Sequence, residues 1–372
     1  MDFSLTEEQE AVRELATRIL ADFTTHERLK EIEAGEERFD RKLWGELASA
    51  GLLGISLPEE VGGAGLGFVA AGVVAEEAGR TAAPVPYVPS VVLGASPIAR
   101  FGNETQHARW VSPMVAGEII LSAALVEDEA EPLQPGTSAR PDGDGWRIDG
   151  TKSFVPAGML ADALVVSART PDGVGLFVVE TGADGLTRRA QETTSREVEA
   201  EVELAGVTVS SEGALVVGAA GMDALRWLIE RAEAALCLQV AGACQAAVKL
   251  TAEYTTQRQQ FDKPIATFQA VGQRAADAFI DAEAVRLTAW QAAWRLAEEL
   301  PATAEVAVAK FWADDGAQRV VHAAQHLHGG MGVDRDYPLH RYYLLVKHLA
   351  LTLGGATTSL LRLGQVLADE PA

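Results

Sequence analysis

Cysteine is nearly absent from this sequence. The two that it contains, Cys237 and Cys244, stand seven residues apart in a helical stretch. That spacing separates them by about 10 Å along a helix axis, beyond the reach of a disulfide. Basic residues are also scarce, with 31 against 53 acidic ones and a formal net charge of -22. Because this charge repels phosphate backbones and anionic lipid surfaces, we expect neither nucleic acid nor a membrane as a partner.

Long apolar runs are missing as well. No window of about twenty residues is apolar throughout, and the first twenty residues show no basic leader followed by a long apolar block. With the unpaired thiols, these absences predict a soluble protein of a reducing compartment, the cytoplasm. The apolar fraction of 48% over 372 residues is enough to bury a full core.

Three stretches of different periodicity follow one another along the chain. Thr6 ahead of three acidic or amide residues is typical of a capped helix start, and helical spacing then dominates. Gly62–Gly65 and the prolines Pro84, Pro86 and Pro89 interrupt it. Short β-rich runs and turns come next, and long Ala-rich helices follow. We therefore predict a mostly helical α+β protein with a helical domain at 1–118, a β domain at 119–218 and a helical domain at 219–372.

Two short motifs in the last stretch are candidates for ligand binding. Arg258 and Phe261 stand three residues apart before a proline turn, a pattern able to seat a phosphate and an adenine. The sequence HGGMG at 328–332 forms a glycine-rich loop whose missing side chains would let the backbone approach a phosphate. Taken singly, a surface arginine with a packed phenylalanine explains the first motif as well, and a turn between helices explains the second.

Taken together, the motifs resemble the signature of the acyl-CoA dehydrogenase family. RQQF at 258–261 is followed by FQAV at 268–271, and HGGMG by YPLHRYY at 337–343. The resemblance extends over nearly the whole chain and includes LPEEVGGAGLG at 57–67. It implies a helical N-terminal domain, a β-barrel-like middle domain and a C-terminal four-helix bundle.

The resemblance also implies FAD, shared at a subunit interface. In the family, the matching residues of one subunit touch the pyrophosphate and adenosine of FAD held by a neighbour. Carried over, these positions are Arg258, Phe261, Gln269, Gly329 and Gly330. One departure is His326, which stands where the family usually has Gln, three residues before the first loop glycine.

The catalytic base of the family has no counterpart in this chain. Family members remove the proton next to the thioester carbonyl while a hydride passes to the flavin, which requires a positioned carboxylate. At the two places where members station a glutamate, this sequence has Gly354 and Ala232. Glu230 and Glu233 lie near the second place, but on a helix they point away from the direction of Ala232. We therefore assign no catalytic residue and keep these two glutamates as the only substitutes.

The residues that contact the flavin ring in the family are also altered. Where the family typically has Leu-Thr-Glu-Pro, this chain has Val126 in place of the threonine, which loses a hydroxyl. Where it has Trp-Ile-Thr-Asn-Gly, this chain has Pro156, which carries no backbone N–H. Donors to the ring are thus lost, while the residues that reach toward a neighbour's FAD remain.

This asymmetry is similar to one subfamily, the heterotetrameric (α2β2) acyl-CoA dehydrogenases of bacterial sterol side-chain degradation, in which only one of two homologous subunits carries the glutamate. Four stretches support the likeness, namely RFDRKLW at 38–44, TAAPVPYVPSVVLGA at 81–95, FQAVGQRAADAFID at 268–281 and LGGATTSLLRLG at 353–364. The resemblance implies the non-catalytic subunit of a flavoprotein oxidoreductase of lipid and steroid metabolism. Its partner would be the homologous catalytic subunit, which binds most of the acyl-CoA, and an electron-transfer acceptor would follow.

Two other hypotheses stay open. The chain would be a self-sufficient homotetrameric dehydrogenase if Glu230 or Glu233 served as a relocated base, or a structural or CoA-binding homologue if it had lost flavin. A metal site is not expected, because the four histidines between His322 and His340 lack an HExxH pattern and no cysteine accompanies them.

Overall fold

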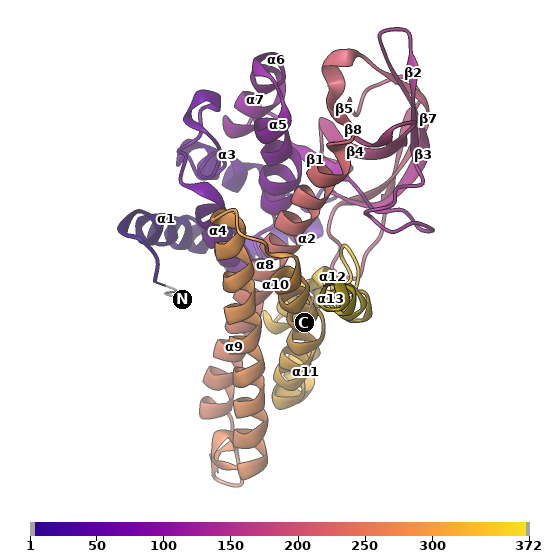
Figure 1. Ribbon diagram of the computed structural model, residues 1–372. Helices are drawn as coiled ribbons and strands as arrows, with labels where there is room; N and C mark the ends of the chain where they lie inside the picture. The colour runs from indigo at the N-terminus through magenta and orange to yellow at the C-terminus, as the bar shows by residue number, and fades with distance from the viewer. Residues whose placement is uncertain (1–3, 370–372) are drawn as a thin grey trace. The chain divides into compact units, whose positions relative to one another are not determined.

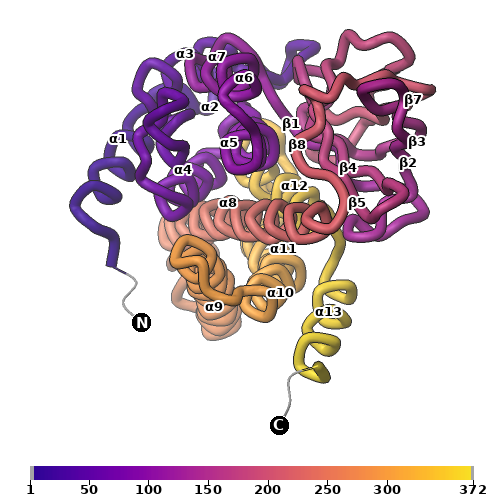
Figure 2. Tube along the Cα trace, turned by 45° about the horizontal axis from the view of Figure 1, so that its top comes forward, coloured from indigo at the N-terminus to yellow at the C-terminus, as the bar shows by residue number. Residues whose placement is uncertain are grey.

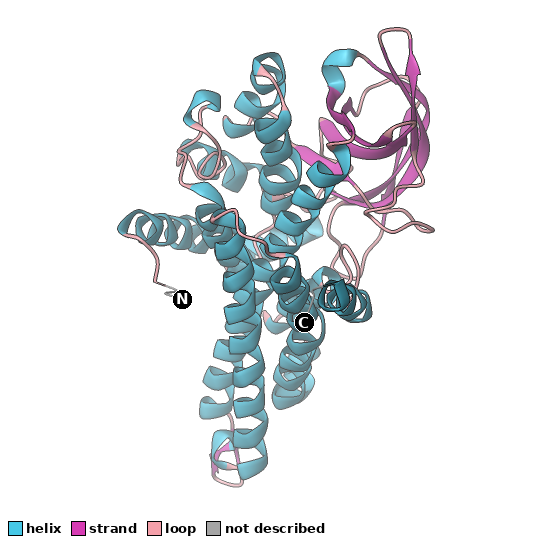
Figure 3. Cartoon of the chain, viewed as in Figure 1, coloured by secondary structure: helices cyan, strands magenta, loops and turns pink. Residues whose placement is uncertain are grey.

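The computed structural model describes residues 4–369; residues 1–3 and 370–372, the extremes of the first and last predicted domains, lie outside the described residues. The chain forms two compact units. One runs to Leu29, takes in Gly72–Ala83 and resumes at Glu233, and the other contains Lys30–Ala71 and Pro84–Ala232. Along the chain, helices come first, strands follow and helices return, as the sequence predicts. Figure 3 distinguishes the helices from the strands by colour. The α+β class is confirmed, and the three-domain division stays a prediction.

The first helix begins where its sequence indicates. The Thr6 side chain accepts from the backbone N–H of Gln9, and the Gln9 side chain accepts in return from the N–H of Thr6. This reciprocal cap satisfies two of the donors that a helix start leaves open. The apolar side chains Val12 and Leu20 are buried on one face of the helix, α1 (Glu7–Phe23).

Short helices make up the part of the second unit before its sheet. Pro84 and Pro86 lie in a connection, as predicted, but the expectation that Pro89 also interrupts helix is wrong. Pro89 lies in the first turn of a π-helical segment, where its missing N–H has no partner to lose. In chain order the elements before the sheet are α2 (His26–Ala34), α3 (Arg41–Ser49), η1 (Glu59–Val61), α4 (Gly67–Thr81), η2 (Val88–Ala95), α5 (Ser96–Phe101), α6 (Glu104–Gln106), η3 (His107–Val111) and α7 (Ser112–Val115).

Eight of the described strands form one mixed sheet with the order β6-β7-β3-β2-β4-β5-β8, in which β1 pairs in parallel with β4, and β9 (Gln259–Gln260) and β10 (Lys263–Pro264) form a separate two-stranded sheet. β4 is buried along most of its length, which matches its continuous apolar run. The strands are β1 (Leu121–Ala124), β2 (Ser138–Asp142), β3 (Gly145–Pro156), β4 (Ala163–Thr170), β5 (Gly173–Glu180), β6 (Leu186–Gln191), β7 (Glu199–Val209) and β8 (Ala214–Gly218), with the short turn η4 (Ser211–Gly213) before β8.

The remaining helices form the bulk of the first unit. From Glu233 on, α8 lies beside α9, α10 and α11 (Figures 1 and 2). Their bounds are α8 (Gly221–Gln257), α9 (Gln269–Ala297), α10 (Thr303–Phe311), α11 (Ala317–His328), α12 (Leu339–Leu349) and α13 (Ala356–Asp369). Between them stand β9 (Gln259–Gln260), β10 (Lys263–Pro264), η5 (Ile265–Thr267), the π-helical η6 (Trp312–Gly316) and η7 (Gly329–Val333).

Helix α8 is long and apolar enough to cross a membrane by length and composition. Within its most apolar window, however, 72% is buried inside the protein. Burial against other helices is what a core helix requires, and Cys237 and Cys244 both face that interior.

Candidate functional site

A small hairpin carries the first predicted motif. β9 and β10 join α8 to α9, and the turn between them places Phe261 and Asp262 at φ angles of 54° and 62°. The side chain of Phe261 is 87% exposed, and its ring meets that of Phe268 edge to face, with ring centroids 6.2 Å apart. Arg258 before the hairpin and Gln269 at the start of α9 are exposed as well. The hairpin thus holds an aromatic ring outward instead of packing it.

The glycine-rich loop follows α11 and also faces outward. Gly329 adopts φ 57° and ψ -132°, a conformation that side chains other than hydrogen do not tolerate. A Cβ on Gly329 or Gly330 would meet no atom within 4 Å, whereas a Cβ on Gly332 would lie 2.7 Å from the carbonyl oxygen of Gln325. Packing therefore demands the third glycine but not the first two, which leave open backbone for a group that approaches from outside.

Aromatic contacts join these two motifs at one end of the helices. Tyr254, in the last turn of α8, stacks on His328, in the last turn of α11, with ring centroids 4.4 Å apart. His328 also bonds the Tyr337 hydroxyl at 3.1 Å and the Ala324 carbonyl oxygen at 2.7 Å. Burial lowers the pKa of His328, so its ring is neutral at pH 7.

The structure therefore brings together the ends of the elements that carry all six predicted FAD residues. Each of the six is exposed in this chain, including His326 in the last turn of α11. An exposed aromatic ring, an arginine and open glycine backbone fit an adenine and a pyrophosphate that another chain holds. Their contact with FAD stays a prediction.

Neither place expected for a base holds a carboxylate. Gly354 lies in the turn between α12 and α13 with φ 115°, and the residue before it, Leu353, has φ 61°. A Cβ on Gly354 would make ordinary contacts of 3.4 to 3.8 Å with Thr358, so crowding does not explain the missing side chain. Ala232 in α8 is fully buried.

The two substitute glutamates differ in their surroundings. Glu233 is 1% exposed, and both its oxygens lie 2.7 Å from Nη1 of Arg362 in α13. The guanidinium of Arg362 thus occupies this buried carboxylate in an ion pair. Glu230 is partly exposed.

The segments that would face a flavin ring are occupied by contacts within the second unit. The N–H of Phe154 donates to the side chain of Gln191 at 2.6 Å, and Pro156 has no N–H to donate. The Pro156 carbonyl oxygen accepts from the hydroxyl of Ser122 at 2.5 Å. Because the N–H of Phe154 is taken and Pro156 has none, neither residue offers a backbone donor in the stretch that the family resemblance predicts to face a flavin.

A buried ion pair lies in the same unit. Lys152, fully buried on β3, donates to Glu127 at 2.6 Å and to Ser167 at 3.1 Å. Burial lowers the pKa of Lys152 to about 8, although the charge of Glu127 opposes this. Burial alone raises the pKa of Glu127, but Lys152 and the N–H of Thr137 bring it below its usual value. The pair fixes the segment after β1 to the sheet.

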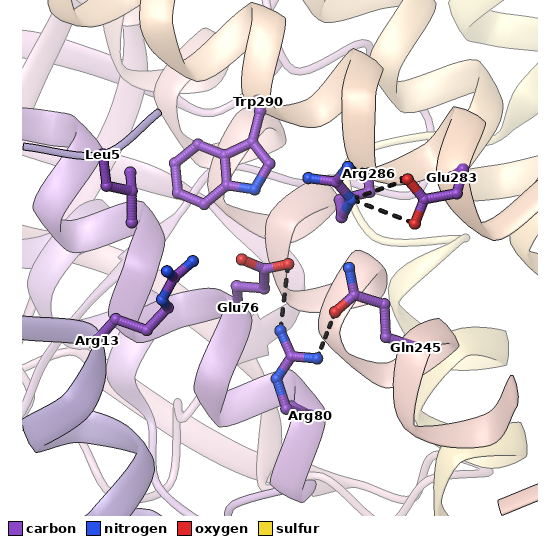
Figure 4. Close-up of a pocket in the computed structure, with 8 residues that line it drawn as sticks. All are labelled: Leu5, Arg13, Glu76, Arg80, Gln245, Glu283, Arg286 and Trp290. Carbon is purple, nitrogen blue, oxygen red and sulfur yellow. Dashed lines mark hydrogen bonds and ion pairs between the residues drawn. The ribbon is translucent and has the colours of Figure 1, made fainter. Parts of the chain in front are cut away.

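A polar pocket of about 400 Å³ lies in the first unit (Figure 4). Arg80 lies 3.4 Å from Glu76 and 3.1 Å from Glu77, and Arg286 lies 2.9 Å from Glu283. Burial raises the pKa of Glu76, and Arg80 opposes the rise. Because its arginines are already paired with carboxylates and none of the predicted site residues lines it, we assign this pocket no ligand. It is lined by Leu5, Arg13, Glu76, Arg80, Gln245, Glu283, Arg286 and Trp290.

Sequence reasoning missed the buried charges near Gly354. Lys310 in α10 and Asp314 in η6 are both buried and lie 2.5 Å apart. The signal was present in AVAKFWADDGA at 307–317, where Lys310 and Asp314 stand four residues apart in a mostly apolar stretch. Their partners on α8 and α13 are far away in sequence.

A mixed sheet between helical segments, with an outward hairpin and glycine loop at one helix end, defines an acyl-CoA dehydrogenase type of flavoprotein. Residues 6–118 match the family described as Acyl-CoA dehydrogenase, N-terminal domain, and residues 219–366 match Acyl-CoA dehydrogenase, C-terminal domain. The chain belongs to the acyl-CoA dehydrogenase family, whose members are FAD-dependent oxidoreductases.

Three relatives illustrate the likeness. Acyl-CoA dehydrogenase FadE27 of Mycobacterium tuberculosis is 40% identical over the full length of both chains. A chain in the crystal structure of the ChsE4-ChsE5 complex from Mycobacterium tuberculosis is 40% identical, covers 100% of both chains and superposes with a TM-score of 0.96. A chain of a Tcur3481-Tcur3483 steroid ACAD variant is 45% identical, covers 98% of both chains and gives a TM-score of 0.92.

Proposed function

We propose that this chain is the FAD-sharing, non-catalytic subunit of a heterotetrameric acyl-CoA dehydrogenase. The observation that carries the proposal is the absence of a base. Gly354 and Ala232 replace the glutamates of the family, and Glu233 is held by Arg362. A chain without a positioned carboxylate cannot remove the proton next to the thioester carbonyl. That step falls to the homologous partner subunit.

The exposed end of the helices supports a role in holding a cofactor from outside. The hairpin segment 258–264 carries Arg258 and Lys263 against a single Asp262, although the whole chain has a net charge of -22. A local excess of positive charge favours a pyrophosphate there, and the ring of Phe261 offers a face to an adenine. FAD, when bound, accepts the hydride of the desaturation reaction.

The exposed apolar side chains beside this hairpin support a partner chain. Phe261, Met331 and Val333 are 87%, 40% and 62% exposed. Apolar groups gathered around cofactor-binding residues are typical of a surface that another subunit covers. The altered stretch at Phe154 and Pro156 argues that the flavin ring lies in the partner and not in this chain.

The relatives support a substrate class for this proposal. The Tcur3481-Tcur3483 protein is described as a steroid ACAD. The similar chain from Mycobacterium tuberculosis comes from a complex named after two chains, ChsE4 and ChsE5. We therefore propose that the complex desaturates steroid side-chain acyl-CoA thioesters, with the acyl-CoA bound mainly by the partner, and passes electrons to an electron-transfer acceptor. The protein would act in the cytoplasm.

Co-expression with the homologous partner subunit tests this proposal. We expect a complex that contains both chains and FAD and that turns over an acyl-CoA. Arg258→Ala should lower the FAD content of that complex about tenfold, which corresponds to the loss of one charge-assisted contact. An unchanged FAD content in Arg258→Ala would favour the flavin-free alternative.

Two further variants separate the proposal from a self-sufficient enzyme. Glu230→Gln should leave the turnover of the complex within about twofold of the wild type, because Glu230 has no part in the chemistry. Glu233→Gln should lower stability through the loss of its pairing with Arg362 but retain turnover per bound flavin. Loss of turnover by a factor of about a thousand in either variant, with flavin retained, would identify a base in this chain.

A further inference from the structure

The hairpin and the glycine loop begin at the ends of two different helices. The hairpin follows α8, where the N–H of Arg258 donates to the carbonyl oxygen of Tyr254 one turn earlier, at 2.8 Å. The glycine loop begins at Gly329, directly after His328 in α11. A ligand that both segments bind gains most when their separation is fixed before it arrives. The backbone hydrogen bonds of an α-helix run within that helix, so side chains must fix this separation.

A stacked pair of rings connects the two helix ends. The rings of Tyr254 and His328 have an interplanar angle of 24° and centroids 4.4 Å apart. The ring of Tyr337 meets that of Tyr254 edge to face at 6.2 Å, and it lies tilted against His328 at 5.1 Å. Aromatic pairs at such distances attract each other beyond the effect of the area that they bury. The three rings thus join the last turn of α8, the last turn of α11 and the segment that leads into α12.

The imidazole of His328 also closes the glycine loop. Its Nδ1 lies 2.7 Å from the carbonyl oxygen of Ala324, which can only accept, so Nδ1 carries the proton. In the neutral ring Nε2 is then unprotonated and accepts from the Tyr337 hydroxyl at 3.1 Å. Tyr337 stands nine residues after His328, at the far end of the loop. One buried ring therefore holds both ends of the loop, while Gly329 and Gly330 stay exposed.

We propose that Tyr254, His328 and Tyr337 are positioning residues, which set the distance between the hairpin and the glycine loop so that both reach one FAD. This inference rests on the proposed function, because it concerns how the same surface binds that cofactor. The three side chains act through Arg258, Phe261 and the backbone of the loop, and they do not themselves contact FAD. Aliphatic side chains would also pack the helices together, but they would not orient the loop through two hydrogen bonds.

Titration of the flavin-free, co-expressed complex with FAD tests the stack. Tyr254→Leu removes the ring, and we expect the dissociation constant for FAD to rise about tenfold, the size of one aromatic contact. Tyr254→Phe keeps the ring and should stay within about twofold of the wild type. The visible absorbance spectrum of the flavin that binds should not change, because these residues act on the adenosine end. A constant that rises equally in both variants, or in neither, would contradict a role for the stack.

A second Tyr–His pair in the same unit provides the matched control. His322 in α11, six residues before His328, bonds the hydroxyl of Tyr343 in α12 at 2.8 Å, and their rings meet edge to face at 5.3 Å. Tyr343→Leu should change the dissociation constant for FAD less than twofold, whereas Tyr337→Leu should raise it about tenfold. Equal effects of these two substitutions would overturn the inference, because the loss of any helix contact would then suffice.

A double substitution shows whether Tyr254 acts through Arg258. Each single change, Tyr254→Leu or Arg258→Ala, should weaken FAD binding about tenfold. If Tyr254 places Arg258, the two changes together should weaken binding about tenfold to thirtyfold, because a misplaced arginine contributes little that can still be lost. A full hundredfold loss would show that Tyr254 acts independently of the hairpin arginine, which contradicts its positioning role.

Failure of this inference and failure of the proposed function give different results. Weakened FAD binding in Arg258→Ala but not in Tyr254→Leu would contradict the positioning role and leave the cofactor surface in place. Unchanged binding in both variants would contradict the cofactor surface itself, and the positioning role with it.

A milder variant covers the case in which Tyr254→Leu does not assemble. Tyr337→Phe removes only the hydroxyl that bonds His328, so the ring contacts remain and one end of the loop is released. We expect the dissociation constant for FAD to rise about threefold, the effect of one neutral hydrogen bond. An unchanged constant in Tyr337→Phe would show that this hydrogen bond does not position the loop, and it would overturn the inference.

Discussion

Two regions of the C-terminal helices differ in the exposure of their functional side chains: aromatic and glycine residues are exposed in one, and charged residues are buried in the other. Around the hairpin and the glycine loop, Phe261 and Gly329 face outward and make few contacts within the chain. Around the turn after α12, which contains Gly354, Lys310 and Glu233 are buried in ion pairs. An exposed aromatic side chain adds little to the stability of an isolated chain, whereas the loss of one partner from a buried ion pair leaves an uncompensated charge in the interior. The difference indicates that the first region serves a ligand or neighbour and the second serves the fold.

The largest effect should come from the buried region. Lys310→Met removes the ammonium that faces Asp314 and Gly354, and we expect the free energy of unfolding to fall by about 3–5 kcal/mol. The matched control is Lys263→Met in the exposed hairpin, where the lysine lies over the ring of Phe268 at 4.7 Å. That change should cost less than about 1 kcal/mol. Urea unfolding measures both, and equal losses would remove the contrast between the regions.

The glycine loop allows the same comparison within five residues. Gly332→Ala places a Cβ 2.7 Å from the carbonyl oxygen of Gln325, so we expect a loss of about 1–3 kcal/mol. Gly330→Ala should change stability by less than about 0.5 kcal/mol, because no atom lies within 4 Å of the new methyl group. If Gly330 faces FAD, its variant should still lower the flavin content of the complex. Thermal unfolding and flavin absorbance test the two effects separately.

The smallest effect on stability should come from the exposed aromatics. Phe261→Ala should change the free energy of unfolding by less than about 0.5 kcal/mol but weaken FAD binding in the complex about tenfold. Phe154→Ala, a half-exposed phenylalanine on β3, should alter flavin content less than twofold. Flavin titration of complexes that carry each variant shows which substitution weakens FAD binding more. The reverse ranking would place the flavin against this chain's own sheet.

Local signals in the sequence predicted much of the fold. The cap at Thr6, the change to strands near residue 119 and the return to helix near 219 depend on neighbours within a few residues. Pro89 was misjudged because a proline in the first turn of a helical segment costs no hydrogen bond, and its sequence pattern is the same as that of a breaker.

The buried ion pairs could not be predicted in the same way. Glu233 and Arg362 are 129 residues apart, and the sequence around one residue does not indicate that the other is its partner. The hairpin and glycine-loop residues were identified through the family signature, whereas their exposure is visible only in the structure. The absence of a carboxylate at Gly354 and Ala232 required no structure, because neither residue has an ionisable side chain in any conformation.

The most direct test of the central claim is a measurement on this chain purified without its partner. Bound flavin per chain, from the visible absorbance of the released cofactor, and turnover of a steroid side-chain acyl-CoA are determined on the same sample. The account predicts far less than one FAD per chain and no turnover above the buffer rate. One FAD per chain with sustained turnover would contradict it.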